Sequence, residues 1–181
     1  MDWNNYLMEF ENILAGKSNN EVYQDEHFME YTKLNWSRLN RWMKQGHLSE
    51  ETIQKIKSIQ ESQNWVLISE PWCGDAAHIV PIIEKMVSEN PHITLSIQLR
   101  DNDSEIEQYL THGSKSIPKL IIRDKHKKDI AIWGPRPKAC QEMYNEMKNE
   151  NRDVDDIKIA LQQWYNSDKG LQIQKEIAAL I

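Results

Sequence analysis

The chain has 181 residues, of which 39% are hydrophobic, and its 22 basic against 28 acidic side chains give a net charge of −6. Seven Trp and six Tyr exclude a disordered chain, because such side chains bury enough apolar surface to offset the entropy of ordering. The acidic balance excludes a general nucleic-acid binder, which needs a basic face.

Three further absences narrow the class of protein. No apolar run approaches the roughly 20 residues of a membrane span, and residues 1–5 lack the basic and apolar parts of a signal peptide. The only cysteines, Cys73 and Cys140, are far apart in the sequence, so no disulfide framework is indicated. We therefore expect a soluble protein located in the cytoplasm.

The first 60 residues follow a helical period. Apolar residues at helical spacing predict a helix over about 3–14, with Asp2 as N-cap and Gly16 after its end. A second helix is predicted from about 25 to 45, ended by Gly46, and Ser49 caps a third that reaches about residue 59.

After residue 64 the pattern alternates between strands and helices. Strands are predicted over 65–69, 93–99, 119–123 and 129–133, and helices over about 74–90, 101–110 and 137–149, followed by two helical stripes near the C-terminus. Asn102 and Glu105 are spaced as a capping box for the second of these helices. Strands joined through helices should be parallel and the last two an antiparallel hairpin, which gives an α/β fold with a mixed sheet.

Cys73 lies where a buried strand ends and a helix begins. Helix N-terminal amides favour a thiolate, whereas the nearby Asp75 opposes it by a similar amount. These effects predict a pKa for Cys73 that is at most modestly lowered. The alternative is that Cys73 is a small buried hydrophobic residue.

The run Trp72-Cys73-Gly74-Asp75, with Ile117-Pro118 opening a later strand, resembles the thioredoxin family. The resemblance implies a three-layer sandwich with a four-stranded sheet, a helix kinked at Pro81, and a cis Ile117-Pro118 bond next to the cysteine. It assigns 64–149 to the core, 1–63 to an N-terminal helical extension and 150–181 to C-terminal helices of the same domain. Trp133 to Pro137 resembles a bacterial subgroup with this Trp-Cys-Gly-Asp motif and no second cysteine.

Two positions depart from the thioredoxin pattern. The second motif cysteine is replaced by Ala76, and the family's buried acid falls at Leu67. The resemblance then implies that Cys73 is a lone nucleophile, released by a low-molecular-weight thiol as co-substrate, with no other cofactor. Cys140 is expected to pack in the core.

The function expected from this pattern is monothiol exchange with a protein disulfide or a small-molecule thiol substrate, catalysed by a thiol-disulfide oxidoreductase. The alternative is a redox-inactive module that binds a peptide or a small thiol compound. Asp75 and Ala76 favour the alternative, and Trp72, Cys73 and Pro118 favour catalysis. The sequence leaves the oligomeric state open.

The substrate site expected from the resemblance combines three backbone features. They are the helix start at Gly74 and Asp75, the Ile117-Pro118 bond, and the turn at Gly134 and Pro135. The main chain of Ile117 would pair with an extended substrate. Trp72 would form an apolar wall or pack in the core, and Arg136 would bind a substrate carboxylate or remain a solvated side chain.

Other residues have two interpretations each. Tyr31, Asn35, Arg38 and Trp42 share one helical stripe, which either borders the Cys73 groove and binds a ligand or hydrogen-bonds neighbouring elements. Glu70 either acts on the Cys73 proton or is an exposed strand end. The histidines show no ligand spacing, so no metal site is predicted, and residues 125–128 form a basic turn.

Overall fold

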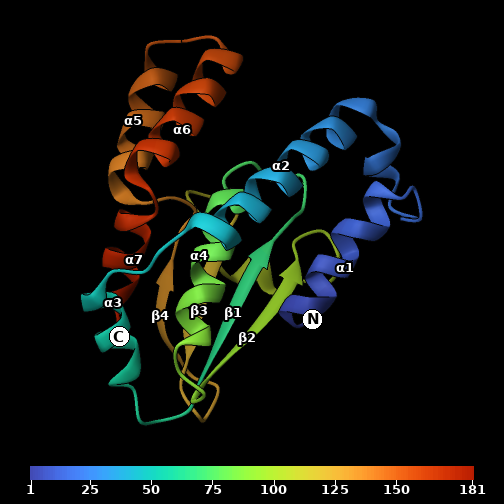
Figure 1. Cartoon of the computed structure of the whole chain (residues 1–181). Helices are drawn as coiled ribbons and strands as arrows, with labels where there is room; N and C mark the ends of the chain where they lie inside the picture. The colour runs from blue at the N-terminus through green and yellow to red at the C-terminus, as the bar shows by residue number, and fades with distance from the viewer.

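A computed structural model describes residues 1–181 and contains one four-stranded sheet in the order β2-β1-β3-β4 (Figure 1). The strands are β1 (Gln63–Ser69), β2 (Ile93–Leu99), β3 (Lys119–Arg123) and β4 (Asp129–Trp133). β1 is parallel to β2 and antiparallel to β3, and β3 and β4 form an antiparallel hairpin. The predicted α/β class with a mixed sheet is confirmed.

The segment between β2 and β3 differs from the prediction. Instead of a helix over 101–110 it contains only the 3-10 helix η2 (Glu105–Gln108), which Ser104 caps by accepting the Ile106 amide. Asp103 has a φ of +50°, a left-handed conformation that an α-helix cannot include. The predicted capping box is therefore wrong. Because no crossover helix forms, β3 enters the sheet antiparallel to β1, and the predicted parallel arrangement is wrong for this strand.

The helices occur close to their predicted positions. They are α1 (Trp3–Leu14), η1 (Glu21–Gln24), α2 (Glu26–Gln45), α3 (Glu50–Lys57), α4 (Ala76–Ser88), α5 (Lys138–Asn149), α6 (Val154–Asp168) and α7 (Leu171–Ala178). Asp2 and Ser49 accept backbone amides as the predicted N-caps of α1 and α3, and Asp25 caps α2. None of these helices is long and apolar enough to cross a membrane.

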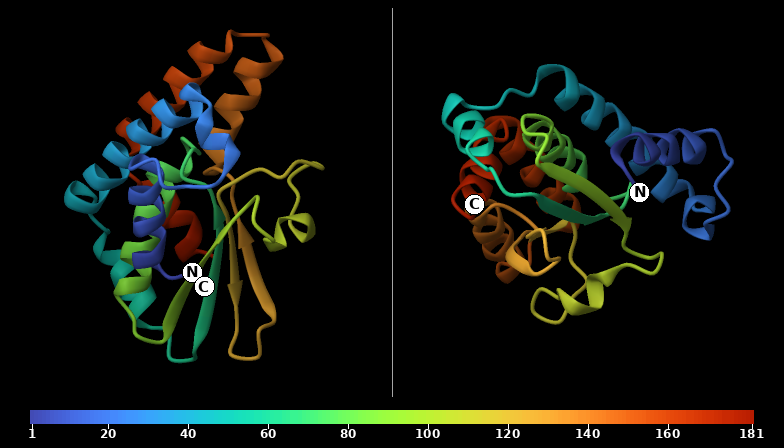
Figure 2. Two further views of the ribbon diagram at one scale, coloured as in Figure 1. Left: turned by 90° about the vertical axis from the view of Figure 1, so that its right-hand side faces the viewer. Right: turned by 90° about the horizontal axis from the view of Figure 1, so that it is seen from below.

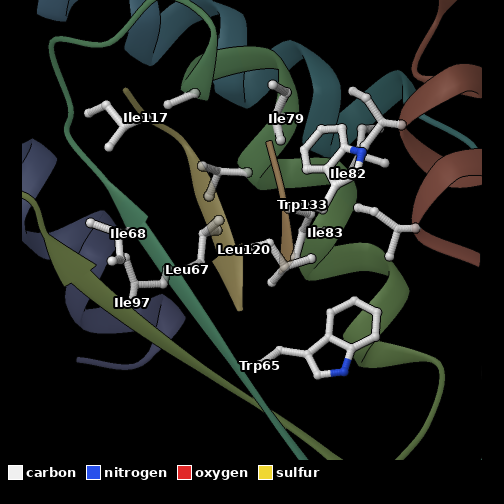
Figure 3. Close-up of a cluster of buried hydrophobic side chains, with 14 of the residues drawn as sticks. Trp65, Leu67, Ile68, Ile79, Ile82, Ile83, Ile97, Ile117, Leu120 and Trp133 are labelled. Carbon is white, nitrogen blue, oxygen red and sulfur yellow. The ribbon is translucent and has the colours of Figure 1, made fainter. Parts of the chain in front are cut away.

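The sheet lies between two layers of different thickness. α4, with α2 and α7 packed on it, covers one face, and η2 with its loop lies on the other (Figure 2). The core of 33 buried hydrophobic residues includes side chains from both chain ends, such as Tyr6 of α1 and Ile177 of α7. Figure 3 shows isoleucines of α4 facing Leu67 and Leu120 of the sheet. This packing fixes β1 and α4, which are joined by the loop of residues 70–75.

Candidate functional site

Cys73 lies in the loop between the end of β1 and the start of α4. The loop is closed by a hydrogen bond from the Cys73 amide to the Glu70 carbonyl, 3.0 Å long. From α2, the fully buried Asn35 donates its side-chain amide to the Pro71 carbonyl at 3.0 Å. Of the two interpretations of the α2 stripe, the structure therefore shows hydrogen bonds to neighbouring elements, and it also shows that the stripe borders the Cys73 loop.

The Cys73 thiol contacts the loop that precedes β3. Its Sγ donates to the Ile117 carbonyl at 3.5 Å, and the Ile117-Pro118 peptide bond is cis. The Ile117 amide, in contrast, makes no hydrogen bond within the chain. Two segments 44 residues apart thus meet at the sulfur, and the Ile117 N–H beside it is free to bind another group.

The thiol is more buried than its place in the sequence suggested. Cys73 is 7% exposed, and burial raises the pKa of its thiol to about 12, with the negative charge of Asp75 as the next contribution. The amides of Ala76 and Asp75 and the charge of Arg136 act in the opposite direction. The expected modest lowering of the pKa is wrong, because desolvation of a thiolate outweighs the helix N-terminus.

Asp75 is held by two side chains distant in the sequence. Its carboxylate pairs with the Arg136 guanidinium at 2.6 Å and accepts the Tyr165 hydroxyl of α6 at 2.9 Å. Asp75 is 8% exposed, so its charge is neutralised inside the protein rather than by solvent. Cys140, expected in the core, is fully buried beside Tyr165, and burial raises the pKa of its thiol to about 12.

Arg136 follows neither of its two predicted interpretations. It is not a solvated side chain, and its guanidinium is occupied by Asp75 rather than open to a substrate carboxylate. It also donates to Gln141 at 3.1 Å and lies 4.3 Å from the ring centroid of Tyr144. Arg136 therefore positions Asp75 near the sulfur.

The turn after β4 completes the backbone arrangement. Gly134 has a φ of +106°, and a Cβ there would lie 2.4 Å from the Pro118 carbonyl oxygen. Its own carbonyl accepts from the buried Lys119 ammonium at 3.2 Å, which also bonds Thr111. The next residue, Pro135, is buried and follows a cis bond. The turn and the Pro118 loop thus pack backbone to backbone.

Trp72 and Glu70 flank the cysteine loop on the α1 and α2 side. The Trp72 ring is partly exposed, lies edge-on to Phe28, and carries the Arg100 guanidinium 4.6 Å from its centroid. Glu70 is 2% exposed and accepts the Asp101 amide at 3.0 Å. Its interpretation as an exposed strand end is wrong, and burial raises the pKa of its carboxyl to about 7.

Sequence reasoning missed the residues that α6 contributes. Gln162 accepts from the His78 ring at 2.6 Å, and its amide nitrogen would lie 3.7 Å from a Cβ at Gly74. Trp42 donates to the other ring nitrogen of His78, so Nε2 carries the proton that bonds Gln162. Burial lowers the pKa of His78 to about 4. No local spacing connects Gln162 or Tyr165 to the cysteine motif.

No cluster of metal-ligating side chains lies at the site, and two surface hollows lie away from it. No group of three or more His, Cys, Asp or Glu side chains could hold a metal ion. The two surface hollows, of about 710 and 480 Å³, are lined by residues of the outer sheet face and of the α2–α7 side, without Cys73 or Pro118.

Comparison with known proteins agrees with this fold. Two solved structures share the fold: a protein of unknown function from Pseudomonas aeruginosa (15% identity, TM-score 0.59, 82% of each chain covered) and an HIV epitope scaffold (16% identity, TM-score 0.61, 86% of this chain and 94% of the scaffold). No curated protein matches the chain. A sequence model described as thioredoxin matches residues 22–148, and the chain therefore belongs to the thioredoxin family.

Proposed function

We propose that this protein is a monothiol redox protein in which Cys73 exchanges disulfides or mixed disulfides, as in the bacterial subgroup that its Trp-Cys-Gly-Asp motif resembles. The observation that carries the proposal is the contact of the Cys73 sulfur with the Ile117 carbonyl, beside an unused Ile117 amide. An extended substrate segment that takes up this donor would lie along the sulfur.

The exchange needs two thiols in sequence. The Cys73 thiol loses its proton, attacks one sulfur of the substrate disulfide and breaks the S–S bond, and the leaving thiolate takes up a proton. A small thiol then attacks the substrate sulfur of the mixed disulfide, and Cys73 leaves and is protonated again. Because the position three residues on is Ala76, the second thiol comes from outside the motif.

The chain offers donors that stabilise the transient thiolate. The amides of Asp75 and Ala76 point at the Cys73 sulfur, and Arg136 adds a positive charge nearby. These groups partly offset the cost of ionising a buried thiol. Trp72 and Gly134, both partly exposed, would form the walls beside the substrate.

A redox-inactive binding module is the second candidate. It is favoured by the same burial of Cys73 that keeps the thiol protonated, with a pKa near 12. In that case the Ile117 amide and the Trp72 wall would hold a peptide or a small thiol compound without covalent chemistry.

The two candidates differ in what happens to Cys73. The protein is incubated at pH 8.5 with bis(2-hydroxyethyl) disulfide, and the mass of the intact chain is followed before and after addition of 2-mercaptoethanol. Exchange predicts a mixed disulfide on Cys73 that the thiol releases, and its loss in Cys73→Ser but not in the matched control Cys140→Ser. A Cys73 thiol that stays unmodified in the folded protein while reacting after denaturation supports the binding module.

A further inference from the structure

Arg38 on α2 is a partly buried cation without an acidic partner. Its only hydrogen bond is from Nη1 to the side-chain Oδ1 of Asn35, at 3.0 Å, and none of the ten ion pairs of the chain includes it. Packing lowers the pKa of Arg38, because desolvation disfavours its charged form. An arginine nevertheless stays protonated in a protein, so an uncompensated positive charge is held at this place.

Arg38 is connected to the cysteine loop by one residue. Asn35, which is fully buried, accepts from Arg38 and donates to the Pro71 carbonyl, two residues before Cys73. A buried amide with both ends bonded has a single orientation. The guanidinium is therefore fixed relative to the loop, while its remaining N–H groups are accessible to solvent, since none is among the buried polar atoms without a partner.

The surroundings of Arg38 add positive charge. It lies on the side of α2 that faces α6, where Lys158 stands 5.0 Å from the ring centroid of Tyr31. Burial is the main cause of the lowered pKa of His78, and the charges of Arg38 and Arg41 add to it, which places both arginines near the His78 ring. Lys158 itself pairs with the exposed Asp155 at 3.0 Å. The charged side chain that acts on Arg38 is the like-charged Arg41, and no acid pairs with Arg38.

From these contacts we infer that Arg38 binds the anionic group, a carboxylate, of the small thiol or disulfide that reacts at Cys73. The inference rests on the proposed function, whose substrate class it names. A guanidinium presents paired donors that match a carboxylate, and partial burial strengthens such a contact relative to water. The other two arginines beside the cysteine loop each pair with an acid, Arg136 with Asp75 and Arg100 with Asp101, so Arg38 is the one without an acidic partner.

Binding is tested first without chemistry. Cys73→Ser protein is titrated with 3,3′-dithiodipropionate or with the neutral bis(2-hydroxyethyl) disulfide, and amide and arginine side-chain NMR signals are followed. The inference predicts saturable shifts around Arg38 and Asn35 for the dicarboxylate, with an affinity at least about ten-fold above that of the neutral disulfide. Arg38→Met should abolish this preference, and Arg41→Met, one turn further along α2, should retain it.

The same reagents then report on reaction. In the otherwise wild-type chain, the ratio of mixed-disulfide rates for the dicarboxylate over the neutral reagent should fall about ten-fold in Arg38→Met and stay unchanged in Arg41→Met. Arg38→Lys should retain part of the ratio. Equal binding of both disulfides, or an equal loss in Arg38→Met and Arg41→Met, overturns the inference. A Cys73 that reacts with neither reagent refutes the proposed exchange, and the NMR titration still decides whether Arg38 is an anion site.

Discussion

The charge of Asp75 should control the reactivity of Cys73. Asp75→Asn removes the negative charge that raises the thiol pKa but retains an oxygen that can accept the Tyr165 hydroxyl. Arg136, whose partner is Asp75, is then left to stabilise the thiolate. We expect the pKa of Cys73 to fall from its value near 12.

The size of this effect follows from the separation of the two groups. At roughly 6 Å and an effective dielectric near 20, one charge contributes about 3 kcal/mol, or about 2 pKa units. At pH 8 the thiolate fraction would rise about 100-fold, while the lower basicity reduces the nucleophilicity by about ten-fold, so the alkylation rate should increase about ten-fold.

The assay is the rate of Cys73 alkylation by iodoacetamide between pH 7 and 10, with peptide mass spectrometry separating Cys73 from Cys140. Arg136→Gln is the variant of opposite sign and should slow the reaction, because the Arg136 charge lowers the Cys73 pKa. Urea unfolding of both variants checks the fold, since breaking a buried pair costs about 3–5 kcal/mol. A rate for folded Asp75→Asn at or below that of the wild type would refute the reasoning.

Three further predictions concern stability. Asn35→Ala removes the buried donor of the Pro71 carbonyl, so urea unfolding should show a free energy of unfolding lower by about 1–3 kcal/mol. An unchanged urea midpoint would contradict this. Gly134→Ala places a Cβ against the Pro118 carbonyl oxygen, whereas a Cβ at Gly113, also at positive φ, has no atom within 4 Å. Gly134→Ala should therefore have a melting temperature well below that of the control Gly113→Ala, which carries only about 1–2 kcal/mol of backbone strain. Burial lowers the pKa of His78 to about 4, so the stability that neutral His78 contributes is present above pH 6.5 and is lost towards pH 4. Burial raises the pKa of Glu70 to about 7, so the stability that protonated Glu70 contributes is present below pH 4.5 and is lost towards pH 7. Each group changes the free energy of unfolding by about 3 kcal/mol over its range, and between pH 4.5 and 6.5 the two changes cancel in the wild type. The urea midpoint should therefore fall with rising pH in His78→Gln, where only Glu70 remains, and rise in Glu70→Gln, where only His78 remains. The same pH dependence in both variants would contradict this prediction.

The elements that were predicted correctly are those with strong local signals. The caps of α1 and α3 and the apolar stripes of the first three helices depend on residues within a few positions of one another. The alternation of β2 and the hairpin of β3 and β4 are local in the same sense. The segment after β2 shows the limit of this approach, because the left-handed conformation of Asp103 is not visible in an apparent capping pattern.

The site was predictable in part. The motif placed Cys73 at a helix start, and the resemblance to thioredoxins brought Ile117 and Pro118 to it, a contact that the structure contains. The state of the thiol could not be derived in this way. Asp75 and Arg136 were assigned separate roles from the sequence, whereas in the structure they neutralise each other.

The linear order of residues was sufficient for the fold class, for the approximate positions of all α-helices except the one expected after β2, and for the place of Cys73 at a helix start, since each depends on short-range periodicity or on a compact motif. The protonation of the Cys73 sulfur and the partners of its charged neighbours emerge only when α6, α2 and the turn after β4 close around it. Desolvation is a property of everything packed around an atom, and side chains up to 90 residues away supply that packing here.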